Sequence, residues 1–408
     1  MSAATLREKA RRLAADPPAA LILCASAAVL LARRAAAFTN AQFWAEDGHF
    51  FERAYVLGAR SLLVPYAGYL HAVPRLVAEA ASRLDPAAAP LAYTSAAALL
   101  TLYVASRTLS PRCPLPRASG YFALAVVLVP DTYEVLLNVV NLQWVLAAGL
   151  VLLLVSRDPA GPGEWAHDLA AALLLGLTGP FSLVLLPLFA WRAASRHTVA
   201  SAVIASGVLL AALLQAGIIW TSPPSDPGVP GPVAPMLAQL LPAVGRRVGG
   251  SLLLGSLLPA DLGIAAGTLT GLATLTGLAY LALRPGPART ERRMIAASLL
   301  LVLAASLFRT RWTLHEYFTP HSNSRYVFLP QLLAIWLLGT LAAGRGRSAR
   351  IALAVALWCL AANLPRLRED AYPDMEWSRY AGRIREGRAM TIPINPPGWT
   401  LILPKRRP

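Results

Sequence analysis

The sequence predicts an all-α, polytopic membrane protein, and three observations lead to this fold class. Of the 408 residues, 56% are hydrophobic and only 14% are charged, whereas soluble domains carry about 25% charged residues. The mean hydropathy is +0.52. Several stretches run for about 18 residues or more with almost no charge, which is enough to cross a bilayer. We therefore expect one transmembrane domain over residues 1–364 and a small tail over residues 365–408.

The strong positive charge has a topological explanation. A formal net charge of +16 would suggest nucleic acid in a soluble protein. Here most arginines lie in short links between apolar segments, and such links stay on the cytoplasmic side of a membrane. We expect no nucleic-acid partner, a cytoplasmic N-terminus and an extracytoplasmic C-terminus. The three cysteines are far apart in the sequence, so neither a zinc site nor a disulfide framework is expected.

The first apolar segment begins near Ala19, after a basic stretch, in the manner of a signal peptide. Arg33 and Arg34 stand where a signal peptide is uncharged, so we predict an uncleaved first span. Residues 38–86 then form the first outside loop. The apolar residues of 50–58 share one helical face, which predicts a helix lying flat in the interface. Residues 70–84 form a second such helix or a short span.

The rest of the chain alternates between apolar segments and basic links. Residues 178–182 interrupt one apolar region with Thr-Gly-Pro-Phe-Ser, and a break at membrane depth needs protein or water beside it. By length and the positive-inside rule we expect about eleven spans. After the first loop they lie at 87–106, in a hairpin over 119–156, in two short runs over 166–195, and at 198–220, 262–283, 294–308, 326–343 and 351–364.

Acidic side chains gather in the first outside loop. The acidic motif, Phe43-Trp44-Ala45-Glu46-Asp47-Gly48, lies in a chain that is otherwise mostly Ala, Leu and Val. One interpretation is that Asp47 caps a helix that starts near Gly48. The other is a general base, because a carboxylate can take a proton from a hydroxyl nucleophile. The residues alone leave both roles open, and also the choice between Glu46 and Asp47.

Two further pairs are candidate substrate-binding residues. His71 and Arg75 are four residues apart, so on a helix they share a face and can bind a phosphate. The alternative is an interfacial helix whose basic side chains reach toward water. Glu134 lies at the tip of the predicted hairpin, four residues before Asn138. Both residues are candidates for binding substrate. For Asn138 the alternative is a hydrogen bond between two helices.

A second polar loop, residues 309–326, is predicted outside although it is rich in arginine. A bound anion explains this exception to the positive-inside rule, because Arg makes bidentate contacts to phosphate. The candidate ligands here are Arg311, His321, Arg325 and Tyr326. A divalent metal is an alternative for the histidines, but the loop lacks a His pair at i, i+4 and a His-Glu-x-x-His spacing. No cofactor is therefore expected.

Together these features resemble the GT-C superfamily of integral-membrane glycosyltransferases. The acidic motif, Pro65-Tyr66-Ala67-Gly68-Tyr69, Gly179-Pro180-Phe181 and the segment 325–330 are similar to stretches in uncharacterised bacterial members. The resemblance implies that Asp47 or Glu46 is the catalytic base. It also implies that late basic residues such as Arg325 hold the phosphate of a polyprenyl-phosphate carrier.

The sequence therefore favours an inverting sugar transfer from a polyprenyl-phosphate donor to a cell-envelope glycan or lipid acceptor, in contact with membrane lipids. The expected location is the outer face of a bacterial cytoplasmic membrane. The alternatives are a transporter or flippase of lipid-linked glycans and a polymerase or ligase of surface glycans. A transporter should place ionisable groups at mid-depth of its spans, whereas here they lie in the predicted outside loops.

Overall fold

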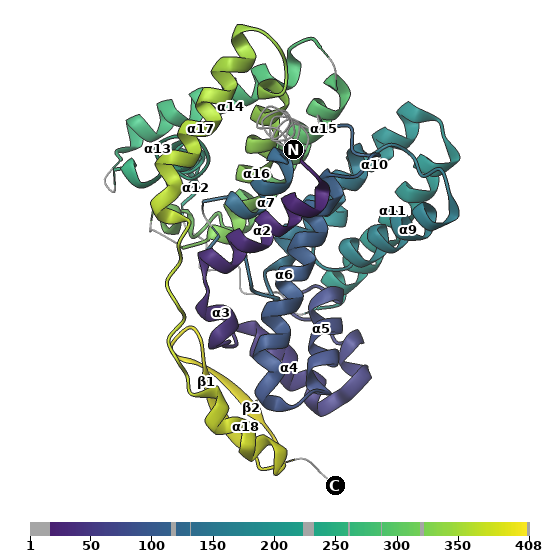
Figure 1. The fold of residues 1–408 in the computed structure, drawn as a ribbon, viewed down its shortest axis with the longest axis vertical. Helices are drawn as coiled ribbons and strands as arrows, with labels where there is room; N and C mark the ends of the chain where they lie inside the picture. Colours follow the sequence, from purple (N-terminus) through teal and green to yellow (C-terminus); the bar gives the residue numbers. More distant parts are fainter. Residues whose placement is uncertain are drawn as a thin grey trace, which may run out of the picture.

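A computed structural model describes residues 17–115, 120–130, 132–222, 232–259, 262–286, 288–318 and 322–405. These residues fold mainly into helices (Figure 1). The α-helices are α2 (Ala19–Arg33), α3 (Ala36–Thr39), α4 (Glu46–Leu57), α5 (Ala72–Ser82), α6 (Ala89–Thr108), α7 (Tyr121–Leu128), α8 (Leu142–Val155), α9 (Pro162–Gly176), α10 (Phe181–Arg196), α11 (Val199–Thr221), α12 (Val233–Val244), α13 (Ser251–Leu254), α14 (Ile264–Leu283), α15 (Arg289–Arg309), α16 (Ser324–Ala342), α17 (Arg347–Asn363) and α18 (Trp377–Arg385).

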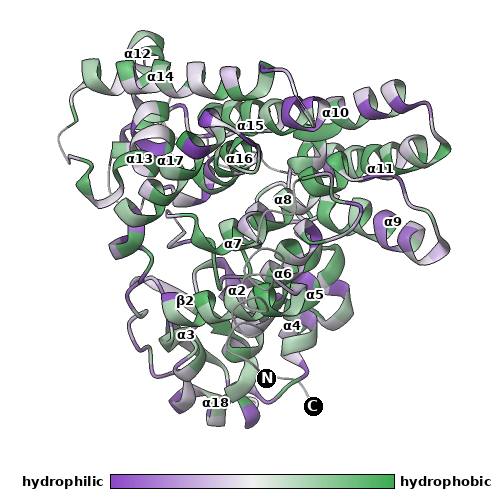
Figure 2. Ribbon diagram, turned by 45° about the horizontal axis from the view of Figure 1, so that its top comes forward, coloured by the Kyte–Doolittle hydropathy of each residue, from purple (hydrophilic) through white to green (hydrophobic). Residues whose placement is uncertain are grey.

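Several helices can cross a membrane, so the predicted integral-membrane character is supported. Five described helical stretches are long and apolar enough for this: Pro86–Thr108, Val199–Thr221, Ile264–Leu283, Ser324–Ala342 and Arg347–Arg366. Figure 2 shows hydrophobic residues along α11 and α15, whereas α18 carries many hydrophilic ones. The predicted number of about eleven spans is not confirmed.

Several predicted spans are interrupted or short. α2 has 15 residues and ends at Arg33, whereas a span needs about 20. The predicted hairpin over 119–156 contains α7 with 8 residues and α8 with 14, and the described residues between them, 129–130 and 132–141, are not helical. The predicted break near 178–182 is confirmed, because α9 ends at Gly176 and α10 begins at Phe181. Residues 70–84 contain only the 11-residue α5, which is too short for a span.

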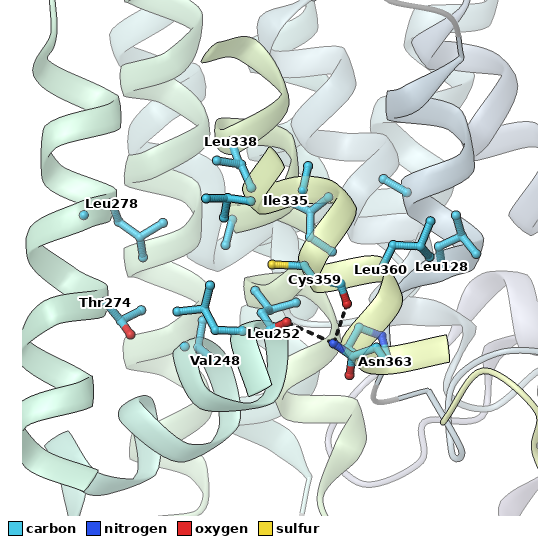
Figure 3. A pocket seen from close by; sticks show the side chains of 18 of the residues that line it. Leu128, Val248, Leu252, Thr274, Leu278, Ile335, Leu338, Cys359, Leu360 and Asn363 are labelled. Carbon is cyan, nitrogen blue, oxygen red and sulfur yellow. Dashed lines mark hydrogen bonds between the residues drawn. The ribbon is translucent and has the colours of Figure 1, made fainter. Parts of the chain in front are cut away.

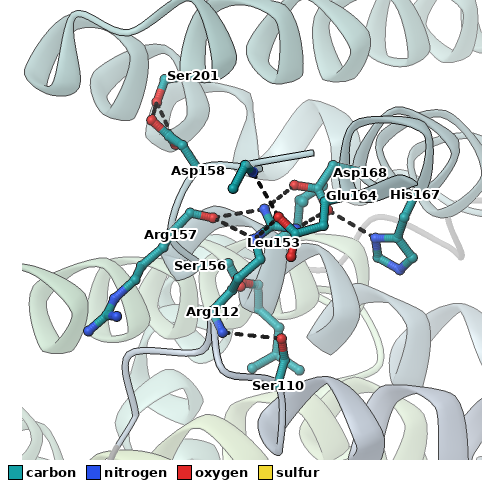
Figure 4. Close-up of polar contacts among 12 residues, drawn as sticks. Ser110, Arg112, Leu153, Ser156, Arg157, Asp158, Glu164, His167, Asp168 and Ser201 are labelled. Carbon is teal, nitrogen blue, oxygen red and sulfur yellow. Dashed lines mark hydrogen bonds and ion pairs between the residues drawn. The ribbon is translucent and has the colours of Figure 1, made fainter. Parts of the chain in front are cut away.

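Three of the predicted basic links lie together at one end of the helices (Figure 4). Arg112 forms an ion pair with Asp168 of α9, and its guanidinium also donates to the Arg157 carbonyl at 2.8 Å. Arg192 of α10 donates to Asp158 at 2.7 Å. The links around 107–115, 157–161 and 192–198 are thereby fastened to one another. This grouping is what alternation between two membrane sides predicts.

The predicted outside loops gather at the other end. Leu70 in the first loop donates its backbone N–H to Gln215 near the end of α11, at 3.1 Å. Ala72 donates to the Leu177 carbonyl in the break between α9 and α10, at 3.1 Å. The loop after α7 contacts the start of α16 through Glu134 and Ser324. The polar loops that the sequence singled out therefore surround one region.

The fold is mainly helical, as predicted, and the C-terminal tail adds one two-stranded hairpin to it. Strands β1 (Met390–Ile394) and β2 (Trp399–Leu403) pair antiparallel, after α18. In Figure 1 the tail lies beside α4, at the end of the molecule opposite α14. Trp377 of α18 stands edge-on to Phe43, with ring centroids 4.7 Å apart. The tail and the first outside loop therefore share one hydrophobic core, in which the predicted apolar face of α4 is buried.

A buried ion-pair group fastens the tail to the end of α2. Arg33 and Arg34 each donate to the Glu369 carboxylate at 2.7 Å. The Arg34 guanidinium also lies over the Tyr372 ring, 4.1 Å from its centroid. Because buried charges need such partners, Glu369 accounts for the burial of two arginines at the end of an apolar helix.

Candidate functional site

The acidic motif is held in place by the tail. Asn395 pairs with Trp44 in a parallel β-bridge, and its backbone N–H donates to the Phe43 carbonyl at 3.2 Å. Ala45 has a positive φ of 44°, which residues with a Cβ rarely adopt. Glu46 is then the first residue of α4. The tail thus fixes the turn from which the acidic side chains leave the backbone.

Asp47 does not cap α4, so the capping interpretation is wrong. Ala45 holds the N-cap position and no side chain caps the helix. Asp47 is only 3% exposed, and its Oδ1 accepts a hydrogen bond from the Val140 backbone N–H at 2.8 Å. Burial raises the pKa of Asp47 well above its usual range, and the hydrogen bond from Val140 lowers it only in part. This environment favours the uncharged acid over the carboxylate that a general base requires.

Asp47→Asn is expected to leave the protein at least as stable as the wild type at neutral pH. The amide keeps an oxygen for the Val140 N–H and replaces an ionisable group in a buried position with one that stays neutral. Asp47→Ala should cost about 1–3 kcal/mol, because it leaves a buried N–H without a partner. Thermal unfolding midpoints of both variants test this. Equal losses in the two variants would contradict the role assigned to Asp47.

Glu46 differs from its neighbour because it is partly exposed. Its carboxylate acts through space on the Tyr66 hydroxyl. Burial and Glu46 both raise the pKa of Tyr66, whereas Arg325 lowers it. Tyr66 is therefore a neutral phenol that lies within electrostatic range of a carboxylate and a guanidinium. Of the two acidic residues, Glu46 is the one that acts electrostatically on Tyr66 and on Arg325, which belong to other loops.

Tyr66 is a site residue that the sequence did not assign. It is paired with Tyr69 by two reciprocal backbone hydrogen bonds of 2.9 Å. The two central residues, Ala67 and Gly68, have positive φ of 48° and 84°, as a type I′ turn requires. Opposite residues of such a pair point to the same face, so the turn presents two phenols side by side. The Tyr-Ala-Gly-Tyr pattern in the sequence could have indicated this turn and its two phenols.

Glu134 connects the loop after α7 to the start of α16. Its Oε2 lies 3.4 Å from Ser324 Oγ and 3.5 Å from the Arg325 backbone nitrogen. A helix N-terminus attracts negative charge, which favours this position for a carboxylate. Glu134 and Glu46 also act electrostatically on the Arg325 guanidinium. Three residues predicted from separate parts of the sequence thus lie within electrostatic range of one another, and Glu134 contacts the Arg325 segment directly.

Tyr326 makes a cation–π contact with Arg325. The Arg325 guanidinium lies over the Tyr326 ring, 5.3 Å from its centroid. The same ring meets Trp144 of α8 edge-on at 5.2 Å. Tyr326 therefore contacts both Arg325 and α8. Its aromatic face stabilises the guanidinium charge.

Asn138 bonds within its own loop and not between helices, so the helix–helix interpretation is wrong here. Its Oδ1 accepts from the Asn141 backbone N–H at 3.2 Å, while the Asn141 amide donates to the Glu134 carbonyl at 2.8 Å. Asn138 Nδ2 is buried without a hydrogen-bond partner among the described residues. These amides shape the loop that carries Glu134, and a substrate-binding role for Asn138 stays a prediction.

His71 and Arg75 lie inside the first loop. Arg75 is 1% exposed, so it does not reach toward water, and its guanidinium donates to the carbonyls of Ser61 and Leu70 at 2.8 and 2.7 Å. His71 precedes α5 with a φ of 54°, and its ring packs 5.4 Å from that of Phe50. Burial, followed by the charge of Arg75, lowers the pKa of His71 to about 3. His71 is thus neutral, and a phosphate-binding role for this pair stays a prediction.

The depressed pKa of His71 makes the stability dependent on pH. Between about pH 3 and pH 6.5 the unfolded chain binds a proton at His71 that the folded chain does not, so acidification favours unfolding. The slope from this one group is about 1.4 kcal/mol per pH unit. His71→Asn, which tolerates the left-handed backbone, should flatten the acid side of the stability profile. Unfolding midpoints between pH 4 and pH 7 test this, and identical slopes would contradict it.

Arg311, another predicted ligand, has contacts within its own segment. Arg311 stacks on Phe308, 4.4 Å from the ring centroid, and donates to its carbonyl at 2.8 Å. His321 lies outside the described residues. Within the described part of the chain no group of three or more His, Cys, Asp or Glu side chains is placed to hold a metal ion.

Glu46, Tyr66, Glu134 and Arg325 are hereafter the carboxylate–arginine cluster. They come from α4, a tight turn, the loop after α7 and the start of α16. The cluster combines a partly exposed carboxylate, a phenol and a guanidinium. Comparison with protein-family models, curated proteins and solved structures found no match to this chain.

Proposed function

We propose that this protein is an integral-membrane glycosyltransferase. It transfers a sugar from a polyprenyl-phosphate carrier to a glycan or lipid acceptor of the cell envelope, at the outer face of a bacterial cytoplasmic membrane. The observation that carries the proposal is the carboxylate–arginine cluster at one end of helices that can span a membrane. Sugar transfer from a lipid phosphate needs a proton acceptor and a ligand for the leaving phosphate, and a carboxylate and a guanidinium are suited to these roles.

The chemistry follows from the two charges. The Glu46 carboxylate takes the proton of an acceptor hydroxyl while that oxygen attacks the anomeric carbon. A new carbon–oxygen bond forms, and the bond from the anomeric carbon to the phosphate oxygen breaks. The lipid phosphate leaves with the bonding electrons, and Arg325 stabilises its developing charge. A single displacement inverts the configuration at the anomeric carbon.

Glu46 is the preferred base because of what surrounds its neighbour. Asp47 is buried and bonded to Val140, whereas Glu46 is partly exposed and acts on Tyr66 and Arg325. Glu134 lies against the backbone of the Arg325 segment and positions it. Tyr66, as a neutral phenol, can donate a hydrogen bond to a sugar hydroxyl.

Proteoliposomes that contain a polyprenyl-phosphate sugar test the proposal against the transporter alternative. A transferase releases polyprenyl phosphate and forms a glycoside when an acceptor is added. A transporter moves intact donor between leaflets and releases none. Movement of donor without release, at a rate that Glu46→Gln does not change, would contradict the enzyme and favour transport.

The proposed orientation predicts which ends are accessible from outside. In a background with Cys24, Cys113 and Cys359 replaced by Ser, Arg379→Cys on the exposed surface of α18 should react with an impermeant thiol reagent in intact cells. Arg289→Cys, exposed at the start of α15, should react only after the cells are opened. The reverse pattern would invert the membrane orientation and place the cluster in the cytoplasm.

A further inference from the structure

An apolar cavity of about 460 Å³ lies between α7, α13, α14, α16 and α17 (Figure 3). Its walls are mainly aliphatic, with Leu128, Val248, Leu278 and Ile335 among the side chains drawn. Three of the five helices that border it, α14, α16 and α17, belong to stretches that can span a membrane. A cavity of this kind, placed among such helices, is suited to a hydrocarbon chain.

A second, polar cavity of about 620 Å³ adjoins the first. Pro130 lines both cavities. The polar cavity is lined by Arg246, Arg247, Arg366 and Arg368 on the basic side and by Glu369 and Asp370 on the acidic side. The Glu369 carboxylate is already paired with the two arginines at the end of α2. Among the described residues that line it, four arginines stand against two acidic residues, which favours an anion.

Asn363 stands at the junction of the two cavities. It lines the apolar cavity, and residues 365 and 366 directly after it line the polar one. Figure 3 shows its amide bonded to two backbone carbonyls, those of Leu252 and Cys359, both at 2.9 Å. The side chain is 3% exposed, and its Oδ1 has no hydrogen-bond partner among the described residues. A buried acceptor of this kind favours a ligand that brings a donor.

We propose that the two cavities together bind one anionic phospholipid of the surrounding membrane, with a hydroxyl-bearing headgroup. An acyl chain fills the apolar cavity, the phosphate contacts the arginines, and a headgroup hydroxyl reaches Asn363 Oδ1. Charge complementarity identifies the class of lipid, because a zwitterionic choline headgroup offers neither a net negative charge nor a donor. None of the residues of the carboxylate–arginine cluster lines either cavity. The site is therefore separate from the proposed sugar transfer and does not depend on it.

The apolar half is tested with a pair of matched glycines. Gly277 of α14 lines the cavity, and a Cβ there meets no atom within 4 Å, so Gly277→Leu adds a bulky side chain at the cavity wall. Gly217 of α11 has equally open space and lines neither cavity, so Gly217→Leu is the control. Native mass spectrometry of protein purified with equal amounts of phosphatidylglycerol and phosphatidylcholine reports the bound lipid. We expect the wild type and Gly217→Leu to retain one phosphatidylglycerol, and Gly277→Leu to lose it.

The polar half is tested with Arg366 and Arg368, which line it. Arg366 also donates to Ser251 Oγ at 3.1 Å, whereas Arg368 is exposed. Arg366→Gln combined with Arg368→Gln should reduce phosphatidylglycerol retention by about a hundredfold or more, since each removes a charge-assisted contact. Arg379→Gln, on the exposed surface of α18, should change nothing. Equal retention of phosphatidylcholine by the wild type would overturn the proposal, and so would unchanged retention by the arginine variant. Displacement of phosphatidylglycerol by an equimolar amount of polyprenyl phosphate would assign the cavities to the carrier and overturn it as well.

Discussion

Glu46→Gln is expected to lower the rate of sugar transfer by about 10²–10⁴ while donor affinity changes little. The amide has nearly the same shape as the carboxylate but cannot take the proton of an acceptor hydroxyl. Glu46 is partly exposed and has no role in the backbone packing around Val140, so the fold should be unaffected. Single-turnover rates and donor dissociation constants, measured on the same preparation, separate chemistry from binding.

Asp47→Asn is the matched control for this experiment. It removes the adjacent carboxyl but keeps an oxygen for the Val140 N–H, so transfer should stay within about tenfold of the wild type, below the loss expected for a base. If Asp47→Asn abolishes transfer and Glu46→Gln does not, the base is Asp47, and its buried environment must then be part of the mechanism. Unchanged rates in both variants would remove the acidic motif from the chemistry.

Arg325→Ala is expected to weaken donor binding and to slow transfer, each by about tenfold to hundredfold. A guanidinium can hold two phosphate oxygens in the bound donor and hold them more tightly as charge develops on the leaving group. Removing a charge-assisted hydrogen bond costs about 1.5–3 kcal/mol, which corresponds to this range. Arg325→Lys should recover part of each loss, because an ammonium lacks the planar fork.

Two comparisons control the Arg325 result. Arg311→Ala changes an arginine of the same loop that stacks on Phe308 and is not part of the cluster, so it should leave binding and transfer near the wild type. If Arg325→Lys matches the wild type in both measurements, Arg325 only anchors α16 at the interface. The carrier phosphate would then have to bind elsewhere.

Segment length and composition predicted the helical membrane scaffold well. The apolar runs at 87–106, 198–220, 262–283, 326–343 and 351–364 correspond to the five stretches able to span a membrane. The break near 178–182 was visible in the sequence because Gly and Pro end helices. The number of spans could not be predicted in the same way, since α2, α7 and α8 are apolar but end early.

The sequence predicted most of the residues of the site, but not which of them contact one another. Residue type and position singled out Glu46, Glu134 and Arg325, yet nothing in the sequence shows that Glu134 meets the start of α16. Asp47 satisfies the backbone of a buried loop that is 93 residues away, and a local capping rule cannot foresee such a partner. Arg33 and Arg34 depend on Glu369 in the same way, across more than 300 residues.

The tail was the largest surprise. Its short length indicated that it cannot form a core of its own and that it folds back over the outer cavity. It instead completes a core with the first outside loop and pairs through Asn395 with the acidic motif. The burial of Trp377 and Ile394 depends on partners more than 300 residues earlier, which no local pattern reveals.

Release of polyprenyl phosphate in a single turnover tests the proposed activity most directly. The purified protein in nanodiscs would receive a panel of polyprenyl-phosphate sugars with mixed cell-envelope acceptors, and mass spectrometry would follow the freed carrier. The account predicts release from at least one donor by the wild type, with formation of a glycoside of inverted configuration, and a loss of about 10²–10⁴ in rate for Glu46→Gln. Release by Glu46→Gln at the wild-type rate, or a product of retained configuration, would contradict it.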